Sequence, residues 1–200
     1  DFYNKEEAVI DEYLRALPVF EDVRTTHLTQ IRGVSRISAV HKDGRYVTSL
    51  LAWLRELKLK HPSGSRPGGV RSHEKFIPEF VFGLNNDDLA FFLASLWDCD
   101  GYMSRKLCHY KTIGCDLAYD VQSLLLRLGI QSVIHTNAYE NEKKANRISY
   151  QVTVYDTTKL AEILNPYMVS RKKDVICEGN SCSFIHRMDF IDEAKNLTNL

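Results

Sequence analysis

The stretch "LAFFLASLWDCDGYM", residues 89–103, decides how the rest of the sequence is interpreted, because it joins an apolar run to two aspartates and a glycine. From Leu89 to Trp97, Ser95 is the only polar side chain. A helix that is apolar on every side is expected to be buried on every side. Its small residues would let another backbone approach closely, so we expect a second helix beside it.

The two aspartates, Asp98 and Asp100, stand at the C-terminal end of this helix. There the macrodipole disfavours a carboxylate by about 0.3 to 1 kcal/mol. A divalent cation would reverse that preference, since Mg²⁺ and Ca²⁺ bind carboxylate and carbonyl oxygens and helix C-termini expose carbonyls. The alternative is a simple turn, which Asp-x-Asp-Gly sequences often form without a metal.

The composition is that of a folded protein, with 44% hydrophobic residues and 26 basic against 26 acidic residues. No apolar run approaches the roughly 18 to 20 residues that cross a bilayer, and the N-terminus has no signal-peptide pattern. The five cysteines are odd in number and form no C-x-x-C pair, which suits reduced thiols. We therefore expect an intracellular protein, cytoplasmic or in the nucleoid, with no membrane association.

The hydrophobic spacing predicts the same order of elements twice, namely a helix, a pair of strands, a short helix and a basic turn. The two basic turns are "SHEKFI" (72–77) and "SRKKDVI" (170–176). Asp43-Gly44 is a turn signal that predicts a hairpin in the first copy. In the second copy, Asn85 and Asp156 are predicted N-caps and Gly129 a C-cap.

This order indicates an internal duplication. The apolar helix with its strand pair precedes only the second copy, so the first copy lacks its leading helix. We divide the chain into a first half, 1–84, that is N-terminally incomplete, a second half, 85–175, and a tail, 176–200, of unknown role.

The segment "LASLWDCDG", residues 93–101, resembles the LAGLIDADG motif of homing endonucleases. It matches the motif at Leu93, Ala94, Leu96, Asp98, Asp100 and Gly101. Its departures replace small with small or apolar with apolar residues, which preserves helix packing. The flanking "HEKFIPEFVF" and "YDVQSLLLRLGIQS" strengthen the resemblance, which covers about residues 5–175 and is closest to endonucleases embedded in inteins.

The resemblance implies an α+β fold of duplicated αββαββα units, whose saddle-shaped antiparallel sheets lie in the major groove of double-stranded DNA. Two motif helices pack side by side, and each contributes the aspartate before its final glycine to one of two active sites. The implied function is a site-specific, metal-dependent double-strand DNA endonuclease that uses Mg²⁺. An upstream segment or a second polypeptide would carry the other motif helix.

Carried over to this sequence, the resemblance makes Asp100 a metal ligand, with the carbonyl of Cys99 beside it. Lys75 and Lys172 are the basic catalytic residues of the two halves, although either neighbour of Lys172 could hold its place. Phosphodiester hydrolysis needs a metal-activated water, a metal on the leaving oxygen and a cation near the developing charge, and Asp and Lys supply all but the water.

Basic and amide side chains on the predicted strands are candidate DNA contacts wherever strand alternation turns them outward. The candidates are Arg105, Lys106, His109, Lys111, Arg147, Gln151, Arg24, Gln30, Arg32 and Arg36.

Three alternatives stay open at the level of sequence. The scaffold could bind DNA without catalysis, or serve only as a structural or protein-binding domain. Separately, Cys177, Cys182 and His186 have a C-x4-C-x3-H spacing that loosely resembles zinc ligands, but no fourth ligand is evident.

Overall fold

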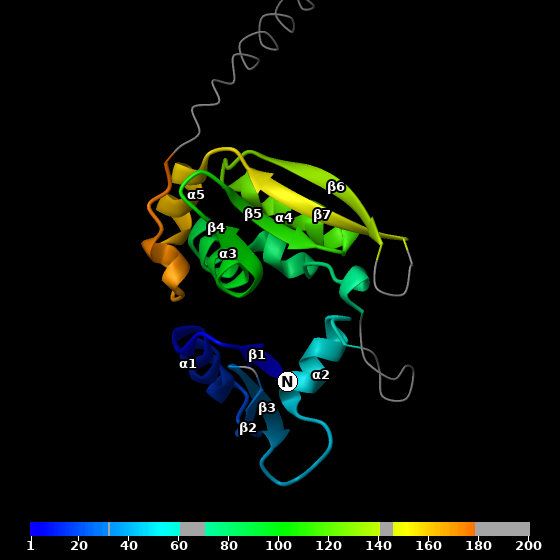
Figure 1. Ribbon diagram of the computed structural model, residues 1–200. Helices are drawn as coiled ribbons and strands as arrows, with labels where there is room; N and C mark the ends of the chain where they lie inside the picture. Colours follow the sequence, from blue (N-terminus) through cyan, green and yellow to red (C-terminus); the bar gives the residue numbers. More distant parts are fainter. Residues whose placement is uncertain (32, 61–70, 141–145, 179–200) are drawn as a thin grey trace, which may run out of the picture.

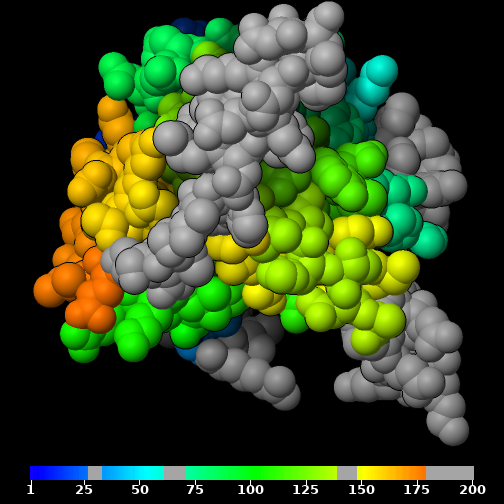
Figure 2. Space-filling model, turned by 90° about the horizontal axis from the view of Figure 1, so that it is seen from above, coloured from blue at the N-terminus to red at the C-terminus, as the bar shows by residue number. Residues whose placement is uncertain are grey.

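The computed structural model describes residues 1–31, 33–60, 71–140 and 146–178. It is a mixture of helices and two open antiparallel sheets, one in each half, which confirms the predicted α+β class (Figure 1). The second half fills nearly all of the described surface in the view from above, so the halves lie one over the other (Figure 2). None of the described helices is both long enough and apolar enough to cross a membrane.

The first sheet has the strand order β1-β3-β2, with helices α1 and α2 following β1 and β3. Its elements are β1 (Phe2–Asn4), α1 (Glu7–Ala16), η1 (Leu17–Val19), β2 (Val23–Ile31), β3 (Val34–His41) and α2 (Ser49–Glu56). The predicted turn at Asp43-Gly44 is not the hairpin turn. β3 ends at His41, where it pairs with Val23, and the hairpin turns beside Gly33, whose φ of 75° suits glycine.

The second sheet has the strand order β4-β5-β7-β6 and carries the larger core. Its elements are α3 (Asn86–Asp100), β4 (Gly101–Met103), β5 (Cys108–Thr112), α4 (Cys115–Arg127), β6 (Ser132–Glu140), β7 (Asn146–Val154) and α5 (Thr157–Leu164). Three short 3-10 segments join or follow these elements, namely η2 (Ser72–Glu74), η3 (Glu79–Gly83) and η4 (Arg171–Asp174).

The predicted caps of the second half are confirmed. Asn85 accepts a hydrogen bond from the N–H of Asp88 at 2.9 Å, and Asp156 accepts one from Lys159 at 2.9 Å. At the end of α4, Gly129 has a φ of 71°, and the next N–H bonds back to the carbonyl of Leu125 at 2.8 Å.

The internal duplication is visible in the sheet topology. β1, α1, β2, β3 and α2 occupy the same order and sheet positions as β5, α4, β6, β7 and α5. The turn after the first strand is also shared: Asn4 accepts a hydrogen bond from the N–H of Glu6, and Thr112 accepts one from Gly114, both at 3.0 Å. β1 therefore corresponds to β5.

It follows that the first half, as far as the structure describes it, has no counterpart of α3 or of β4. The sequence analysis expected the helix and both strands of its strand pair to precede only the second copy. That expectation is wrong for one strand, because β1 is the counterpart of β5. The division of the chain at residues 84 and 175 stays a prediction.

Helix α3 is buried along one side and not on every side, so that prediction was wrong. Leu89, Leu93 and Trp97 are fully buried against the core, whereas Phe91 is 46% exposed and Ser95 is also exposed. Among the described elements, α3 packs on α5, β4 and β5, which leaves the Phe91 face uncovered.

Gly101, where α3 passes into β4, is required for space rather than for an unusual backbone angle. A Cβ atom there would lie 2.4 Å from Cδ1 and 2.8 Å from Cα of Trp97. Because Trp97 is fully buried, neither atom can retreat easily.

We predict that Gly101→Ala lowers the free energy of unfolding by about 1–3 kcal/mol, the usual cost of overpacking. Gly83→Ala is the matched control, since a Cβ at Gly83 meets nothing within 4 Å. Urea denaturation of both variants measures the difference. Equal stability of the two would show that the Trp97 contact does not constrain this junction.

Candidate active site

The two aspartates at the end of α3 have different environments. Asp98 is only 5% exposed, and its carboxylate accepts hydrogen bonds from the N–H groups of Val169 at 2.9 Å and Ser170 at 3.2 Å. Asp100 is exposed, and no hydrogen bond or ion pair involves its carboxylate in the described part of the chain. The expectation that a cation balances both aspartates is therefore wrong for Asp98, which backbone amides satisfy.

Lys172 binds the same end of α3 and offsets the negative end of its dipole. Its Nζ donates to the carbonyls of Trp97 at 2.8 Å and Asp98 at 2.9 Å, so an ammonium stands where the helix dipole is negative. Burial lowers the pKa of Lys172, while Glu6 and Asp98 act in the opposite direction. These bonds give Lys172 a structural role, and its catalytic role stays a prediction.

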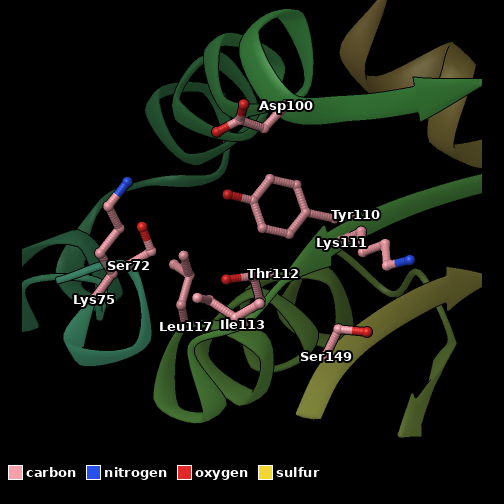
Figure 3. Close-up of a pocket in the computed structure, with 9 residues that line it drawn as sticks. All are labelled: Ser72, Lys75, Asp100, Tyr110, Lys111, Thr112, Ile113, Leu117 and Ser149. Atoms are coloured by element: carbon pink, nitrogen blue, oxygen red, sulfur yellow. The ribbon is translucent and has the colours of Figure 1, made fainter. Parts of the chain in front are cut away.

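Asp100 and Lys75 line one pocket of about 540 Å³. Figure 3 shows the side chains of Lys75 and Tyr110 directed toward the space beside Asp100, whereas Lys111 points away from it. The remaining lining residues are Ser72, Thr112, Ile113, Leu117 and Ser149. A carboxylate, an ammonium and a phenol thus border a single open space.

The backbone around Lys75 is held in place by α4. The N–H of Ile77 donates to the carboxylate of Asp120 at 2.8 Å, and the side chain of Ile77 is buried in the core. At the start of α4, a Cβ at Gly114 would lie 3.1 and 3.2 Å from the carbonyls of Ser72 and Lys75. This close approach fixes the segment while leaving the Lys75 side chain exposed.

Tyr110 is a site residue that the sequence analysis missed. It is 3% exposed and pairs with Gly101 across β4 and β5, with its ring centroid 5.7 Å from that of Trp97. Burial, and then the charge of Asp100, raise the pKa of Tyr110, so its hydroxyl remains a hydrogen-bond donor at neutral pH. The signal was available, because strand alternation places Tyr110 on the side of Gly101, next to the motif.

The residues present fit a hard divalent cation whose remaining ligands are oxygens of water or of a substrate phosphate. No group of three acidic, histidine or cysteine side chains gathers around one point in the part of the chain that the structure describes. Mg²⁺ is commonly held by one or two carboxylates together with waters and substrate phosphates. Asp100 supplies one such carboxylate. Lys172 binds the carbonyls of Trp97 and Asp98 and not the carbonyl of Cys99, which was the other predicted metal ligand.

Several predicted DNA contacts share the face of the second sheet opposite the core. By register, His109 pairs with Thr153 and Lys111 with Gln151, while the intervening Tyr110 faces the core. The ring of His109 stacks on that of Tyr102, with 4.8 Å between the ring centroids. Burial, and then the charge of Lys111, lower the pKa of His109. A neutral imidazole there is suited to hydrogen bonding rather than to charge pairing.

In the first sheet, Arg36 on β3 pairs with Tyr3 on β1, just as Gln151 on β7 pairs with Lys111 on β5. Arg36 therefore holds the position equivalent to that of Gln151. Arg24 shares that face, opposite the buried Ile37, and Arg36 forms an ion pair with Asp1 at 2.6 Å.

The other predicted contacts are placed less favourably or are not described. Arg105 lies in the β4–β5 turn in an ion pair with Glu178, and Lys106 is exposed in the same turn. Arg32 and the side chains of Gln30 and Arg147 lie outside the described residues.

Comparison with known proteins connects one part of this chain, from α3 to α5, to a family. Residues 87–166 match the sequence model of the LAGLIDADG-like domain. Residues 87–166 form a LAGLIDADG-like domain. The resemblance seen in the sequence is thereby confirmed, and the departures at Ser95, Trp97 and Cys99 are accommodated within it.

The sequence relatives include the replicative DNA helicase DnaB of Synechocystis sp., 41% identical over 93 residues that make up 43% of this chain and 10% of the helicase. The same helicase from Rhodothermus marinus is 38% identical over 109 residues, 51% of this chain and 10% of the relative. The chain therefore spans about a tenth of the length of these relatives.

Among solved structures, mesophilic variants of the homing endonuclease I-DmoI superimpose with a TM-score of 0.54 and 12% identity, covering 86% of this chain and 80% of theirs. At that identity the likeness shows the fold, which is the LAGLIDADG endonuclease fold.

The LAGLIDADG helix yields a prediction that separates its two aspartates. Asp98→Ala should lower the free energy of unfolding by about 2–4 kcal/mol, because two backbone N–H groups lose a charged acceptor. Asp100→Ala should change it by less than about 0.5 kcal/mol, because Asp100 is exposed. Chemical denaturation at neutral pH compares the two, and a larger loss for Asp100→Ala would contradict these assignments.

Proposed function

We propose that this chain is part of an intein-encoded homing endonuclease, a site-specific and metal-dependent enzyme that cuts both strands of DNA. The observation that carries this proposal is the carboxylate of Asp100, which is unpaired within the described residues and faces Lys75 across an open pocket at the end of the LAGLIDADG helix. A match limited to about a tenth of a helicase, in a chain with an endonuclease fold, supports an element inserted in a host protein.

In this proposal, DNA lies along the outward faces of the two sheets. Lys111 and Gln151 on one sheet, with Arg36 at the equivalent position of the other, reach the groove and the phosphates. Because the protein has no net charge by formal count, affinity depends on these local faces, and it should fall steeply with salt.

Each pocket residue has a distinct task. A divalent cation at Asp100 would supply the activation of water and the neutralisation of the leaving oxygen. Lys75 brings a positive charge beside the scissile phosphate, where negative charge grows in the transition state. The protonated hydroxyl of Tyr110 donates a hydrogen bond into the same space and helps to position the phosphate.

The second active site requires a second motif helix. The exposed face of α3, with Phe91 and Ser95 at its centre, is where that helix would pack. We propose that another segment or polypeptide supplies it, together with the strand equivalent to β4.

We predict that Asp100→Asn retains DNA binding but lowers the Mg²⁺-dependent cleavage rate by at least about 10²-fold. The assay uses supercoiled plasmids carrying a randomised insert, with nicking and linearisation scored separately and binding measured by gel shift. Undiminished cutting by Asp100→Asn would remove this residue from the mechanism. Binding without any metal-dependent product from the parent chain would identify a catalytically inactive DNA-binding module instead.

Lys75 and Lys172 should respond differently to truncation. Lys75→Ala is expected to slow cleavage by about 10²-fold with unchanged stability, because Lys75 is exposed at the pocket. Lys172→Ala is expected to lower the free energy of unfolding by about 1–2 kcal/mol, because two carbonyls at the end of α3 lose a charged donor.

Rates and denaturation midpoints measured on the same preparations distinguish the two lysines. If Lys172→Ala slowed cleavage at unchanged stability, Lys172 would be catalytic as the sequence predicted. If Lys75→Ala left the rate unchanged, the pocket would not be the active site.

A further inference from the structure

Two thiols outside the candidate active site lie in contact at the β4–β5 edge of the second sheet. The Sγ atoms of Cys108 on β5 and Cys177, just after η4, are 3.7 Å apart. Each sulfur also lies 3.8 Å from the carbonyl oxygen of Ser104. Cys108 is fully buried and Cys177 is partly exposed, so solvent reaches the pair from the side of Cys177.

The backbone around Cys177 is held at this edge by contacts with two other segments. The N–H of Glu178 donates to the carbonyl of Arg105 at 2.7 Å, and the side chains of these two residues form an ion pair. The hydroxyl of Thr157, on α5, donates to the carbonyl of Glu178 at 3.1 Å. Figure 2 shows this orange end of the described chain beside the green β4–β5 segment. These contacts keep the thiol of Cys177 within reach of Cys108.

Residues 169–178 form a strap that runs from the end of α3 to this pair of thiols. At one end of the strap, the N–H groups of Val169 and Ser170 donate to the carboxylate of Asp98. Next to them, the ammonium of Lys172 binds two carbonyls in the last turn of α3. Cys177 stands at the other end. The strap therefore connects the support of the candidate active site to a pair of thiols.

The described surroundings of the two thiols favour a disulfide over a metal site. No third acidic, histidine or cysteine side chain joins the pair within the described residues, and Cys182 and His186 lie outside them. A disulfide needs only the two sulfurs, about 2.05 Å apart, which asks for an approach of about 1.7 Å. Cys108 is fixed in a strand of the core, whereas Cys177 lies in the irregular segment after η4 and can make that approach.

We propose that Cys108 and Cys177 are a reversible redox site, at which a small disulfide such as glutathione disulfide links the two cysteines. Cys177 reacts first because it is partly exposed, and its thiolate displaces one thiol from the oxidant. The thiolate of Cys108 then attacks Sγ of Cys177 and releases the second thiol. The two cysteines together lose two protons and two electrons, and the oxidant takes them up as two free thiols.

The reactivity of the two thiols agrees with this order. Burial, and then the neighbouring Cys177, raise the pKa of Cys108, so its attack is the slower step. Disulfides that form in reducing compartments are usually transient and redox-sensing. The pair therefore suits a switch that follows the redox state of the surroundings.

Oxidation fastens the strap to β5 while its other end stays bonded to α3. The crosslink joins residues 69 positions apart, and it restricts the unfolded chain accordingly. The oxidised protein is therefore more stable, and the strap opens less often. Both effects are measured without DNA, so their failure is distinct from a failure of the proposed nuclease function.

The bond is tested on the full 200-residue chain in buffers with increasing ratios of glutathione disulfide to reduced glutathione. Peptide mapping after alkylation should find a Cys108–Cys177 disulfide at high ratios and free thiols again in excess reduced glutathione. Cys177→Ser should form no such crosslink. Cys99→Ser is the matched control, because it also removes an accessible thiol, and it should oxidise like the parent chain.

Hydrogen exchange and thermal unfolding test the effect on the strap. The backbone amides of residues 169–178 should exchange at least about 10-fold more slowly in the oxidised protein, and its unfolding midpoint should rise by at least about 5 °C. Cys177→Ser should show neither change between oxidising and reducing buffers.

Four results would overturn the proposal. Cys108 and Cys177 could stay reduced in glutathione disulfide alone, or a mixed disulfide on Cys177 could persist without closing onto Cys108. The crosslink could join another pair of cysteines or resist excess reduced glutathione. A Cys108–Cys177 disulfide that leaves the exchange of residues 169–178 unchanged would equally contradict the proposed fastening of the strap.

Discussion

The whole candidate site depends on how the C-terminal end of α3 is held. Backbone amide donors fix the carboxylate of Asp98, and the ammonium of Lys172 binds the carbonyls of Trp97 and Asp98 in the last turn of the helix. Trp97 fills the space beside Gly101, so no side chain fits at the residue where the chain leaves the helix. These constraints together set the position from which Asp100 projects into the pocket.

This arrangement explains why two carboxylates can stand at a helix end that the dipole disfavours. One of them is a structural acceptor inside the protein, and the positive charge of Lys172 offsets the unfavourable dipole for both. Among the residues that the structure describes, Asp100 has no hydrogen-bond or ion-pair partner, and it lies in a pocket with Lys75 and Tyr110. Rigid support of the neighbouring residues leaves the functional side chain available for an external ligand.

The parts of the fold that sequence predicts well are those with local causes. The caps at Asn85, Asp156 and Gly129 follow from side-chain and backbone chemistry within a few residues. The hairpin turn was misplaced because Asp43-Gly44 is a strong local signal, while the long-range pairing of His41 with Val23 ends the strand first.

The residues of the candidate site likewise differ in whether local sequence predicts their positions. The motif and its spacing identified Asp100 and Lys75, which the pocket does bring together. The separate fate of Asp98 and the position of Lys172 depend on contacts with residues more than 70 positions away, which no local pattern encodes. The same holds for Cys108 and Cys177, whose Sγ atoms lie 3.7 Å apart although 69 positions separate the two residues in the sequence.

The central claim is that the end of α3 delivers the carboxylate of Asp100 to a divalent cation. An anomalous difference map from crystals of this chain grown with Mn²⁺ tests it most directly. The account predicts a peak within about 2.0–2.6 Å of an Asp100 carboxylate oxygen, inside the pocket that Lys75 lines. A carboxylate bonded instead to another protein group, with no metal peak beside it, would contradict the account.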